Sequence, residues 1–153
     1  MAGATRRRLL TVALAGVLVV AAPFALSGCS MIEGLIEQQT GSDVDLGGNT
    51  VPADFPTVVP LAQGEVVNGS KVTASGGETV WNVLMNVSDP AAPDSIAAQL
   101  EGAGFTSTTT GQVTESGGTL TYAKDNLIVN VLLAKVDTGW TANYTVAQTA
   151  ATP

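Results

Sequence analysis

The stretch TVWNVLMNVS, residues 79–88, decides the fold of this chain of 153 residues. Its apolar residues recur at every second position: Trp81, Val83, Met85 and Val87. The positions between them include two amides, Asn82 and Asn86. A period of two over this length predicts a β-strand that buries one face and exposes a polar one.

Turn-forming residues divide the chain around this strand into one helix and several further strands. Before it, a short strand over Lys71–Ser75 leads into the tight turn Gly76-Gly77. After it, Pro93 and Asp94 suit a first helical turn, and a helix is predicted from about Pro93 to Ala103. Four more strands are then predicted, over Phe105–Val113, Thr119–Lys124, Leu127–Val136 and from Trp140 to Val146. Because Leu127–Val136 is apolar in both phases apart from Asn130, it is predicted to be a central strand covered at least partly on both faces.

The element order strand-strand-helix-strand-strand-strand-strand predicts the α+β class. We expect an antiparallel sheet of about five to six strands, with one helix packed on one face and the last four strands in a meander. Residues 51–148 should form a single domain, with 149–153 as a disordered tail, and Pro52, Pro56 and Pro60 should give its start an extended, strap-like course. The predicted core joins two tryptophans, two valines and the helix stripe: Trp81, Trp140, Val129, Val131, Ile96 and Leu100.

The N-terminal segment has the layout of an export signal. Arg6-Arg7-Arg8 precede an apolar run from Leu9 to Leu26, and the run ends in Leu26-Ser27-Gly28-Cys29. These four residues resemble the lipobox of bacterial lipoproteins. The resemblance implies that residues 1–28 are a signal peptide cut before Cys29, and that lipid on the Cys29 thiol anchors the protein to the extracytoplasmic face of the cell membrane.

Two alternatives concern the same segment. An uncleaved membrane anchor would need the whole apolar run, whose 18 residues are marginal for spanning and include Pro23. The single cysteine of the chain, at the position that a lipobox requires, favours the lipoprotein. The arginines also resemble a twin-arginine export motif, so the route, Sec or twin-arginine, stays open. In its Ala-, Gly-, Val- and Thr-rich composition the chain resembles small uncharacterised lipoproteins of high-GC Gram-positive bacteria.

Residues 29–50 are predicted to be a lipidated, flexible tether. The part from Thr40 to Asn49 is rich in glycine and aspartate. Asp43, Asp45 and Gly47 faintly resemble a calcium loop, but a third oxygen ligand is missing, so a solvated acidic linker is the preferred interpretation. No metal site and no cofactor are predicted.

Charge and composition exclude several classes of function. The full chain carries a formal charge of −7, and without residues 1–28 it keeps 3 lysines against 13 acids, which gives −10. A protein this acidic, with no arginine after residue 28, lacks the basic surface that nucleic acids require. The chain has no histidine, and lipidation would consume its single cysteine, so Ser-His and Cys-His catalysis are excluded and no enzyme activity is expected.

Two hypotheses for function remain, with an enzyme third. The first is a lipid-anchored extracytoplasmic binding or interaction module, whose partner is an unidentified envelope protein or small ligand. The second is a non-catalytic structural or accessory subunit of a cell-envelope complex. The candidate contact face is rich in amides and hydroxyls but nearly uncharged: Asn82, Asn86, Asn130, Thr141 and Asn143. A solvated sheet face explains these residues most simply, and a ligand-binding face is the alternative.

Overall fold

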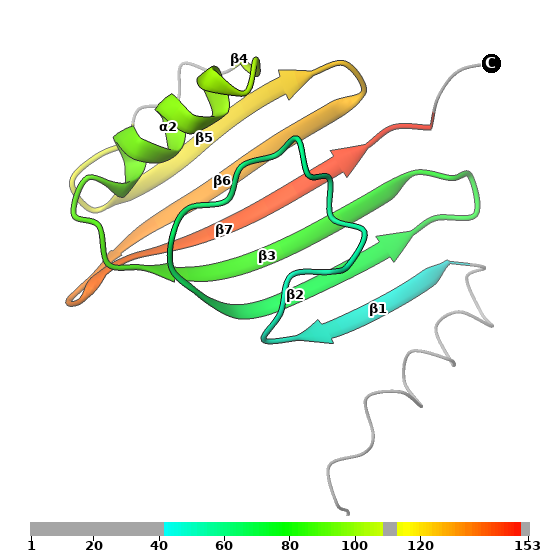
Figure 1. The fold of residues 1–153 in the computed structure, drawn as a ribbon, viewed down its shortest axis with the longest axis horizontal. Coiled ribbons are helices and arrows are strands. Elements are labelled where there is room, and N and C mark those ends of the chain that lie inside the picture. Colours follow the sequence, from blue (N-terminus) through cyan, green and yellow to red (C-terminus); the bar gives the residue numbers. More distant parts are fainter. Residues whose placement is uncertain (1–41, 109–112, 151–153) are drawn as a thin grey trace, which may run out of the picture.

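The computed structural model describes residues 42–108 and 113–150, which form one antiparallel sheet with a helix (Figure 1). The sheet has seven strands in the order β1-β2-β3-β7-β6-β5-β4. In chain order the elements are β1 Asp43–Gly48, β2 Glu65–Thr73, β3 Thr79–Val87, α2 Ala92–Gly102, β4 Thr106–Ser107, β5 Gly117–Lys124, β6 Leu127–Val136 and β7 Gly139–Gln148. The proposed signal segment, Cys29 and residues 151–153 lie outside the described residues.

The predicted α+β class, with an antiparallel sheet and one helix, is confirmed. Strands β4 to β7 form the expected meander, and β7 then pairs with β3 along its whole length, from Thr79 opposite Gln148 to Val87 opposite Trp140. This pairing joins the two halves of the chain and places β7 in the middle of the sheet. The number of strands differs from the prediction by the addition of β1.

Strand β1 differs from the prediction of a flexible tether over residues 29–50 in the part of that segment that the structure describes; residues 29–41 lie outside it. Asp43, Val44 and Asp45 pair with β2, and the register then shifts before Gly48 pairs with Gly69. Gly47 makes this irregularity possible because its φ is 58° and a Cβ there would collide with the carbonyl oxygen of Gly69. The ladder with β2 thus orders a segment whose own composition favours a loop.

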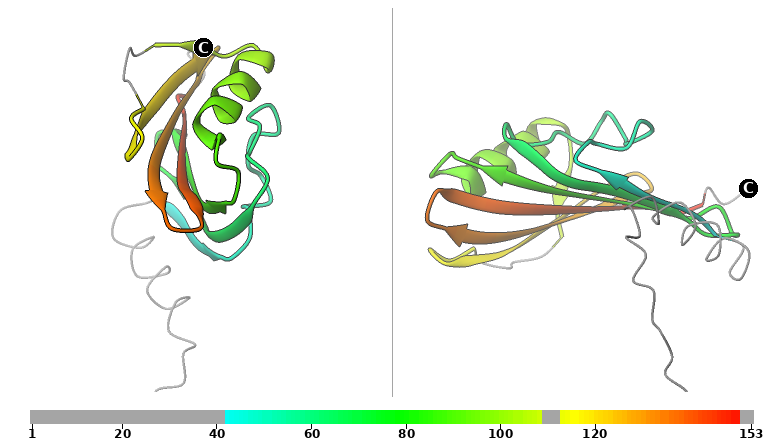
Figure 2. Two further views of the ribbon diagram at one scale, coloured as in Figure 1. Left: turned by 90° about the vertical axis from the view of Figure 1, so that its left-hand side faces the viewer. Right: turned by 90° about the horizontal axis from the view of Figure 1, so that it is seen from below.

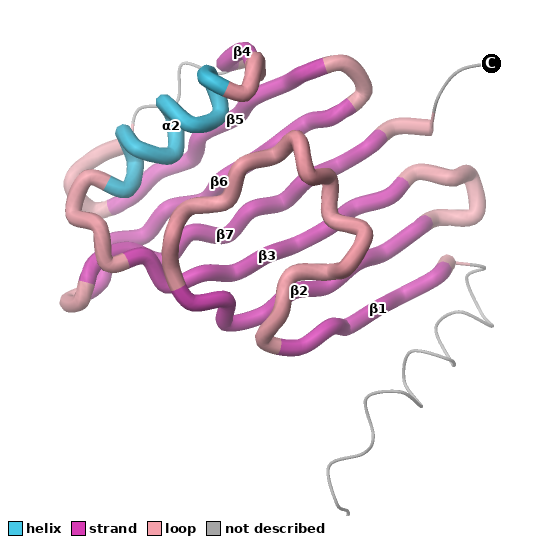
Figure 3. The backbone as a smooth tube through the Cα atoms, viewed as in Figure 1, coloured by secondary structure: helices cyan, strands magenta, loops and turns pink. Residues whose placement is uncertain are grey.

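One side of the sheet is covered by two elements (Figure 2, Figure 3). Helix α2 lies over the β5–β6 half, and the irregular segment 49–64, which we call the strap, lies over the half formed by β2, β3 and β7 (Figure 1). The strap contributes Phe55, Val59 and Ala62 to the core, and α2 contributes Ala92, Ile96 and Leu100. The predicted strap is therefore a covering layer, but its course is not extended throughout, because the N–H groups of Phe55 and Val59 bond back to the carbonyls of Pro52 and Pro56 in two turns.

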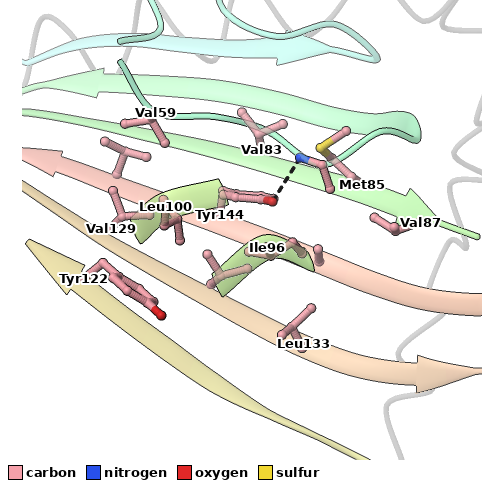
Figure 4. Packing of buried hydrophobic residues seen from close by; sticks show 14 of the residues in the cluster. Val59, Val83, Met85, Val87, Ile96, Leu100, Tyr122, Val129, Leu133 and Tyr144 are labelled. Atoms are coloured by element: carbon pink, nitrogen blue, oxygen red, sulfur yellow. Dashed lines mark hydrogen bonds between the residues drawn. The ribbon is translucent and has the colours of Figure 1, made fainter. Parts of the chain in front are cut away.

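The predicted core is confirmed, since all six residues named from the sequence are buried in one cluster: Trp81, Trp140, Val129, Val131, Ile96 and Leu100. Tyr122 and Tyr144 are buried in the same cluster (Figure 4). The Tyr144 hydroxyl accepts a hydrogen bond of 3.1 Å from the backbone N–H of Ala62, which fixes the end of the strap to the central strand.

A second contact fastens the start of the strap. The indole N–H of Trp81 donates to one oxygen of Asp54 at 3.2 Å, and the Lys71 ammonium pairs with the other at 3.1 Å. Burial opposes ionisation of this carboxyl, but the hydrogen bonds from Lys71 and Trp81 outweigh it and lower the pKa of Asp54. The strap is thus held at both ends by side chains of the sheet.

Both ends of α2 follow from local chemistry. Asp89 accepts hydrogen bonds from the Ala91 N–H and the Ser95 hydroxyl, both at 2.8 Å, and these bonds lower the pKa of Asp89. Pro93 lies in the first turn, as predicted, where its missing N–H leaves no backbone bond unmade. At the other end Gly104 adopts a left-handed φ of 86°, and the Phe105 N–H bonds back to the carbonyl of Leu100.

The C-terminal end of the domain also differs from the prediction. Residues 149–153 were expected to be a disordered tail, but Thr149 is held to the β5–β6 turn. Its N–H donates to the Asn126 carbonyl at 3.1 Å, and the Asn126 amide donates to the Thr149 carbonyl at 3.2 Å. The ordered domain therefore extends past Gln148.

Candidate functional site

The other side of the sheet is covered by no element among the described residues. We call the outward-facing positions of β2, β3, β7, β6 and β5 on this side the open face. Here Ile128 is 42% exposed and Leu132 is 55% exposed. These two side chains differ from the prediction that β6 is covered at least partly on both faces, because α2 and the strap both lie on the opposite side.

The strand register arranges the open face in rows that run across five strands. One row is polar: Ser70, Asn82, Thr145, Asn130 and Thr121. The next row is apolar: Val72, Val80, Ala147, Ile128 and Ala123. On the other side of the polar row, amides alternate with leucines: Asn68, Leu84, Asn143, Leu132 and Thr119. The last row is Glu65, Asn86, Thr141, Ala134 and Gly117.

All five residues of the predicted contact face lie on this surface. Asn82 and Asn86 come from β3, Thr141 and Asn143 from β7, and Asn130 from β6, so they occupy three adjacent strands. The structure brings them together, while their role as ligand contacts stays a prediction.

Several of these polar groups bond to one another along the sheet. The Asn82 amide donates to the Thr145 hydroxyl at 3.4 Å, and the Thr121 hydroxyl donates to the Asn130 carbonyl oxygen at 2.9 Å. These bonds fix the side chains in place and reduce the entropy lost when a partner binds. The polar row is therefore a preorganised strip of amides and hydroxyls.

Asn143 differs from its neighbours. Its side-chain oxygen is buried and accepts no hydrogen bond from any described residue. By register Asn143 lies between Leu84 and Leu132, which offer no donor. A buried oxygen without a donor costs about 1–3 kcal/mol, so this amide does not serve the stability of the domain.

The open face is nearly free of charge. Among the positions in its four rows only Glu65, at one end of β2, is ionisable. The three lysines of the described residues serve the covered side: Lys71 pairs with Asp54, Lys124 donates to the Ala103 carbonyl at 2.7 Å, and Lys135 lies 4.8 Å from the Trp140 ring centroid. An acidic protein thus presents one neutral surface.

The aliphatic half of this surface was not predicted from the sequence. The amides and hydroxyls were predicted to form a contact face, but not the aliphatic residues that alternate with them across the sheet: Val72, Val80, Ile128 and Leu132. The available signal was β6 itself, apolar in both phases. Within residues 42–108 and 113–150, one helix and one proline-rich strap are too few elements to cover both sides of a sheet of this width, and one apolar phase of β6 is left outside.

A second candidate lies on the covered side, where a hollow of about 220 Å³ opens between the strap, the end of β3 and the start of α2. Its lining is mixed: Ala62, Gln63, Val87, Asp89, Ala92, Ser95, Ile96 and Gln99. The two groups best suited to chemistry, Asp89 and Ser95, already bond to each other and hold the first turn of α2. Neither tryptophan lines the hollow.

Metal-ligating side chains are dispersed over the described part of the chain. No group of three His, Cys, Asp or Glu side chains there is placed to hold a metal ion. No polar or charged residue in the same ranges is buried. The open face is the remaining candidate.

Comparison with protein-family models, with curated proteins and with solved structures finds no match for this chain. Within residues 42–108 and 113–150, no helix has both the length and the hydropathy to cross a membrane.

Proposed function

We propose that this protein is a lipid-anchored, extracytoplasmic interaction module without catalytic activity, which binds a protein partner over the open face. The observation that carries the proposal is a broad, neutral sheet surface on an otherwise acidic domain, with Ile128 and Leu132 exposed beside ordered amides. Exposed aliphatic side chains next to fixed polar groups are typical of protein interfaces.

A protein partner suits this surface better than a small ligand. The open face is built from the side chains of adjacent strands, and the hollow lies on the other side of the sheet. Sugars stack on aromatic rings, but the two tryptophans and two tyrosines of the chain are all buried in the core. Amides and aliphatic side chains fit a second protein surface of the same composition.

The alternative, a permanent accessory subunit of an envelope complex, is favoured by the same exposed aliphatic residues. The core distinguishes the two. It is a single cluster that joins α2, the strap and strands β3 and β5 to β7, so the domain is expected to fold alone. A self-sufficient domain favours a module that meets its partner after folding.

Anchoring is tested through Cys29. Cys29→Ala should abolish labelling by a fatty-acid analogue and release or stall the protein, whereas the neighbouring change Ser30→Ala should leave labelling intact. A Cys29→Ala protein that is cleaved and still partitions fully with membranes would contradict the proposed anchor.

Occupancy of the open face is tested by thiol labelling on intact cells. Leu132→Cys and Val58→Cys place comparable thiols on the open face and on the strap, at positions that are 55% and 39% exposed. If a partner covers the open face, a maleimide should label Leu132→Cys much more slowly than Val58→Cys, with the rates in denaturant as reference. Equal rates on cells would overturn the proposed binding surface.

A further inference from the structure

We infer that the partner of the open face is a second copy of this chain, bound sheet against sheet in a symmetric dimer. The inference rests on the proposed function, because it names the partner of the same surface. It follows from the charge of the molecule, the chemistry of the rows and the area that they offer.

Charge selects the open face as the place where two copies can meet. The described residues contain 11 acids and 3 lysines, so two copies repel each other over most of their surfaces. Acids mark the strap, the start of α2 and the turns, and β1 directs Asp43 and Asp45 to the covered side, opposite Thr73 and Lys71 of β2. The rows of the open face hold a single acid, Glu65, at one end of β2. Self-association over this face therefore buries almost no like charge.

The rows are also able to pair with themselves. A two-fold interface brings the same patch of both copies together, so each chemical group must suit its own kind. Amides and hydroxyls satisfy this condition because each carries both a donor and an acceptor, and aliphatic side chains satisfy it by apolar contact. A face dominated by one sign of charge would not. A polar strip between apolar positions also fixes the register of the two sheets.

The position of the rows agrees with a two-fold arrangement. β7 is the middle strand of the sheet, with Asn143 and Thr145 near the centre of the open face. Leu84 and Leu132 lie on either side of Asn143, on β3 and β6. When one such face is laid on the other with the two-fold axis along β7, β3 of each copy lies over β6 of the other. Leu84 of one copy then contacts Leu132 of the second copy.

The area is sufficient for a reversible dimer. Five strands about 4.8 Å apart, with about eight residues of about 3.3 Å each, span roughly 600 Å². Two such faces bury roughly 1,200 Å² in total, the lower end of the range for specific interfaces. Sheets packed in this way lie about 10 Å apart with their strands within about 30° of one another. Anchoring both copies to one membrane raises their effective concentration and favours a dimer of modest affinity.

The test is site-directed cross-linking of the full chain in its own membrane. Leu132→Cys and Val80→Cys each add a thiol to the open face, Val58→Cys adds one to the strap, and the unsubstituted chain accounts for any reaction of Cys29. A bis-maleimide with a reach of about 10 Å, the expected distance between the sheets, should join two copies through Leu132→Cys and through Val80→Cys. Val58→Cys and the unsubstituted chain should stay monomeric.

A pair of opposite charges tests whether the open face of one copy contacts the open face of the other. Leu132→Asp, introduced together with Val80→Cys, should reduce the cross-linked dimer by about tenfold or more, because two new carboxylates would be buried together. Mixing Leu132→Asp copies with Leu132→Lys copies should restore the cross-link between them. Val58→Asp, the matched control on the strap, should leave the dimer unchanged.

The outcomes separate this inference from the proposed function. If neither Leu132→Cys nor Val80→Cys gives a cross-linked homodimer, the inference that the partner is a second copy of this chain is wrong. If the same thiols instead join a different envelope protein, the proposed function survives with another partner. If the thiols at positions 132 and 80 cross-link to no protein, and a maleimide labels them as fast as it labels Val58→Cys, both the second copy and the proposed function are wrong.

Discussion

Tyr144 shows how one side chain couples two layers of the fold. Its ring is fully buried in the core, and its hydroxyl accepts the N–H of Ala62 from the strap at 3.1 Å (Figure 4). Burial raises the pKa of Tyr144 to about 12, since a phenolate there would lose its hydration. An unfolded tyrosine ionises near pH 10, so this contribution to folding is fully present below about pH 10 and is lost as the pH rises toward 12.

Tyr144→Phe should therefore lower the free energy of unfolding by about 1–3 kcal/mol, because the buried N–H of Ala62 loses its acceptor. It should also weaken the loss of stability between pH 10 and 12. Tyr122→Phe is the control, since the Tyr122 hydroxyl donates to Glu101 on the exposed side of α2 and its removal orphans no backbone group. Chemical denaturation at neutral and alkaline pH measures the free energy of unfolding of both variants. Equal losses for Tyr144→Phe and Tyr122→Phe would contradict the role assigned to Tyr144.

Replacing Asn143 is expected to have the opposite effect on the free energy of unfolding. Because its buried oxygen has no donor among the described residues, Asn143→Leu should raise the free energy of unfolding by about 1 kcal/mol. Asn130→Leu, two strand positions away across the β6–β7 ladder, should not, because the Asn130 oxygen accepts the Thr121 hydroxyl. Thermal unfolding of the two variants compares them. A destabilised Asn143→Leu protein would mean that the amide makes a bond beyond the described residues.

At the scale of elements, β1 is where composition and tertiary structure disagree. Its six residues, DVDLGG, have weak strand propensity, and their ladder with β2 places them in the sheet. Gly47 is the critical position, since its positive φ and the nearby Gly69 carbonyl leave no room for a side chain.

Gly47→Ala should therefore detach β1, whereas Gly48→Ala, with open space around the new methyl group, should not. Limited proteolysis with a protease of broad specificity, followed by mass measurement, distinguishes them. The resistant fragment of the unsubstituted chain and of Gly48→Ala should begin before Asp43, and that of Gly47→Ala near Val51. If all three fragments begin near Val51, β1 is not a stable part of the sheet.

The elements also show how far sequence reasoning extends. The helix and strands β3, β5, β6 and β7 could be predicted because their period, Thr79–Val87 above all, agrees with the turn residues between them. Two predicted strands have other bounds: β2 begins at Glu65 rather than at Lys71, and β4 covers Thr106–Ser107 of the predicted Phe105–Val113. β1 could not be predicted, because its order comes from a partner strand far along the chain. The amides of the candidate face were found, but Ile128 and Leu132 were assigned to a covered surface. Deciding which apolar phase of β6 is covered requires knowing that α2 and the strap share one side.

The whole molecule has two unlike sides. All three lysines of the described residues, the strap and α2 lie on one side of the sheet, and the other side is a neutral face made of strands alone. Long-range electrostatics and short-range contacts therefore act against each other in self-association. The acidic bodies repel, and the open faces attract.

Salt should separate the two effects. Raising the ionic strength from about 0.02 to 0.5 M shortens the Debye length from roughly 20 Å to about 4 Å and screens the repulsion between acidic bodies. Because the proposed interface contains almost no ion pair to weaken, the cross-linked dimer of Leu132→Cys should increase with salt. A dimer that salt dissolves would contradict a neutral interface.

Strand β1 has a mechanical consequence for an anchored protein. If Cys29 holds the lipid, 13 residues separate it from Asp43 and allow the domain at most about 45 Å from the membrane surface. A pull along this connection acts first on β1, an edge strand that pairs with β2 and supplies no residue of the core cluster. Peeling off its six residues would lengthen the reach by about 20 Å while the strap, the helix and the core stay folded. The first strand would thus yield under tension before the domain unfolds.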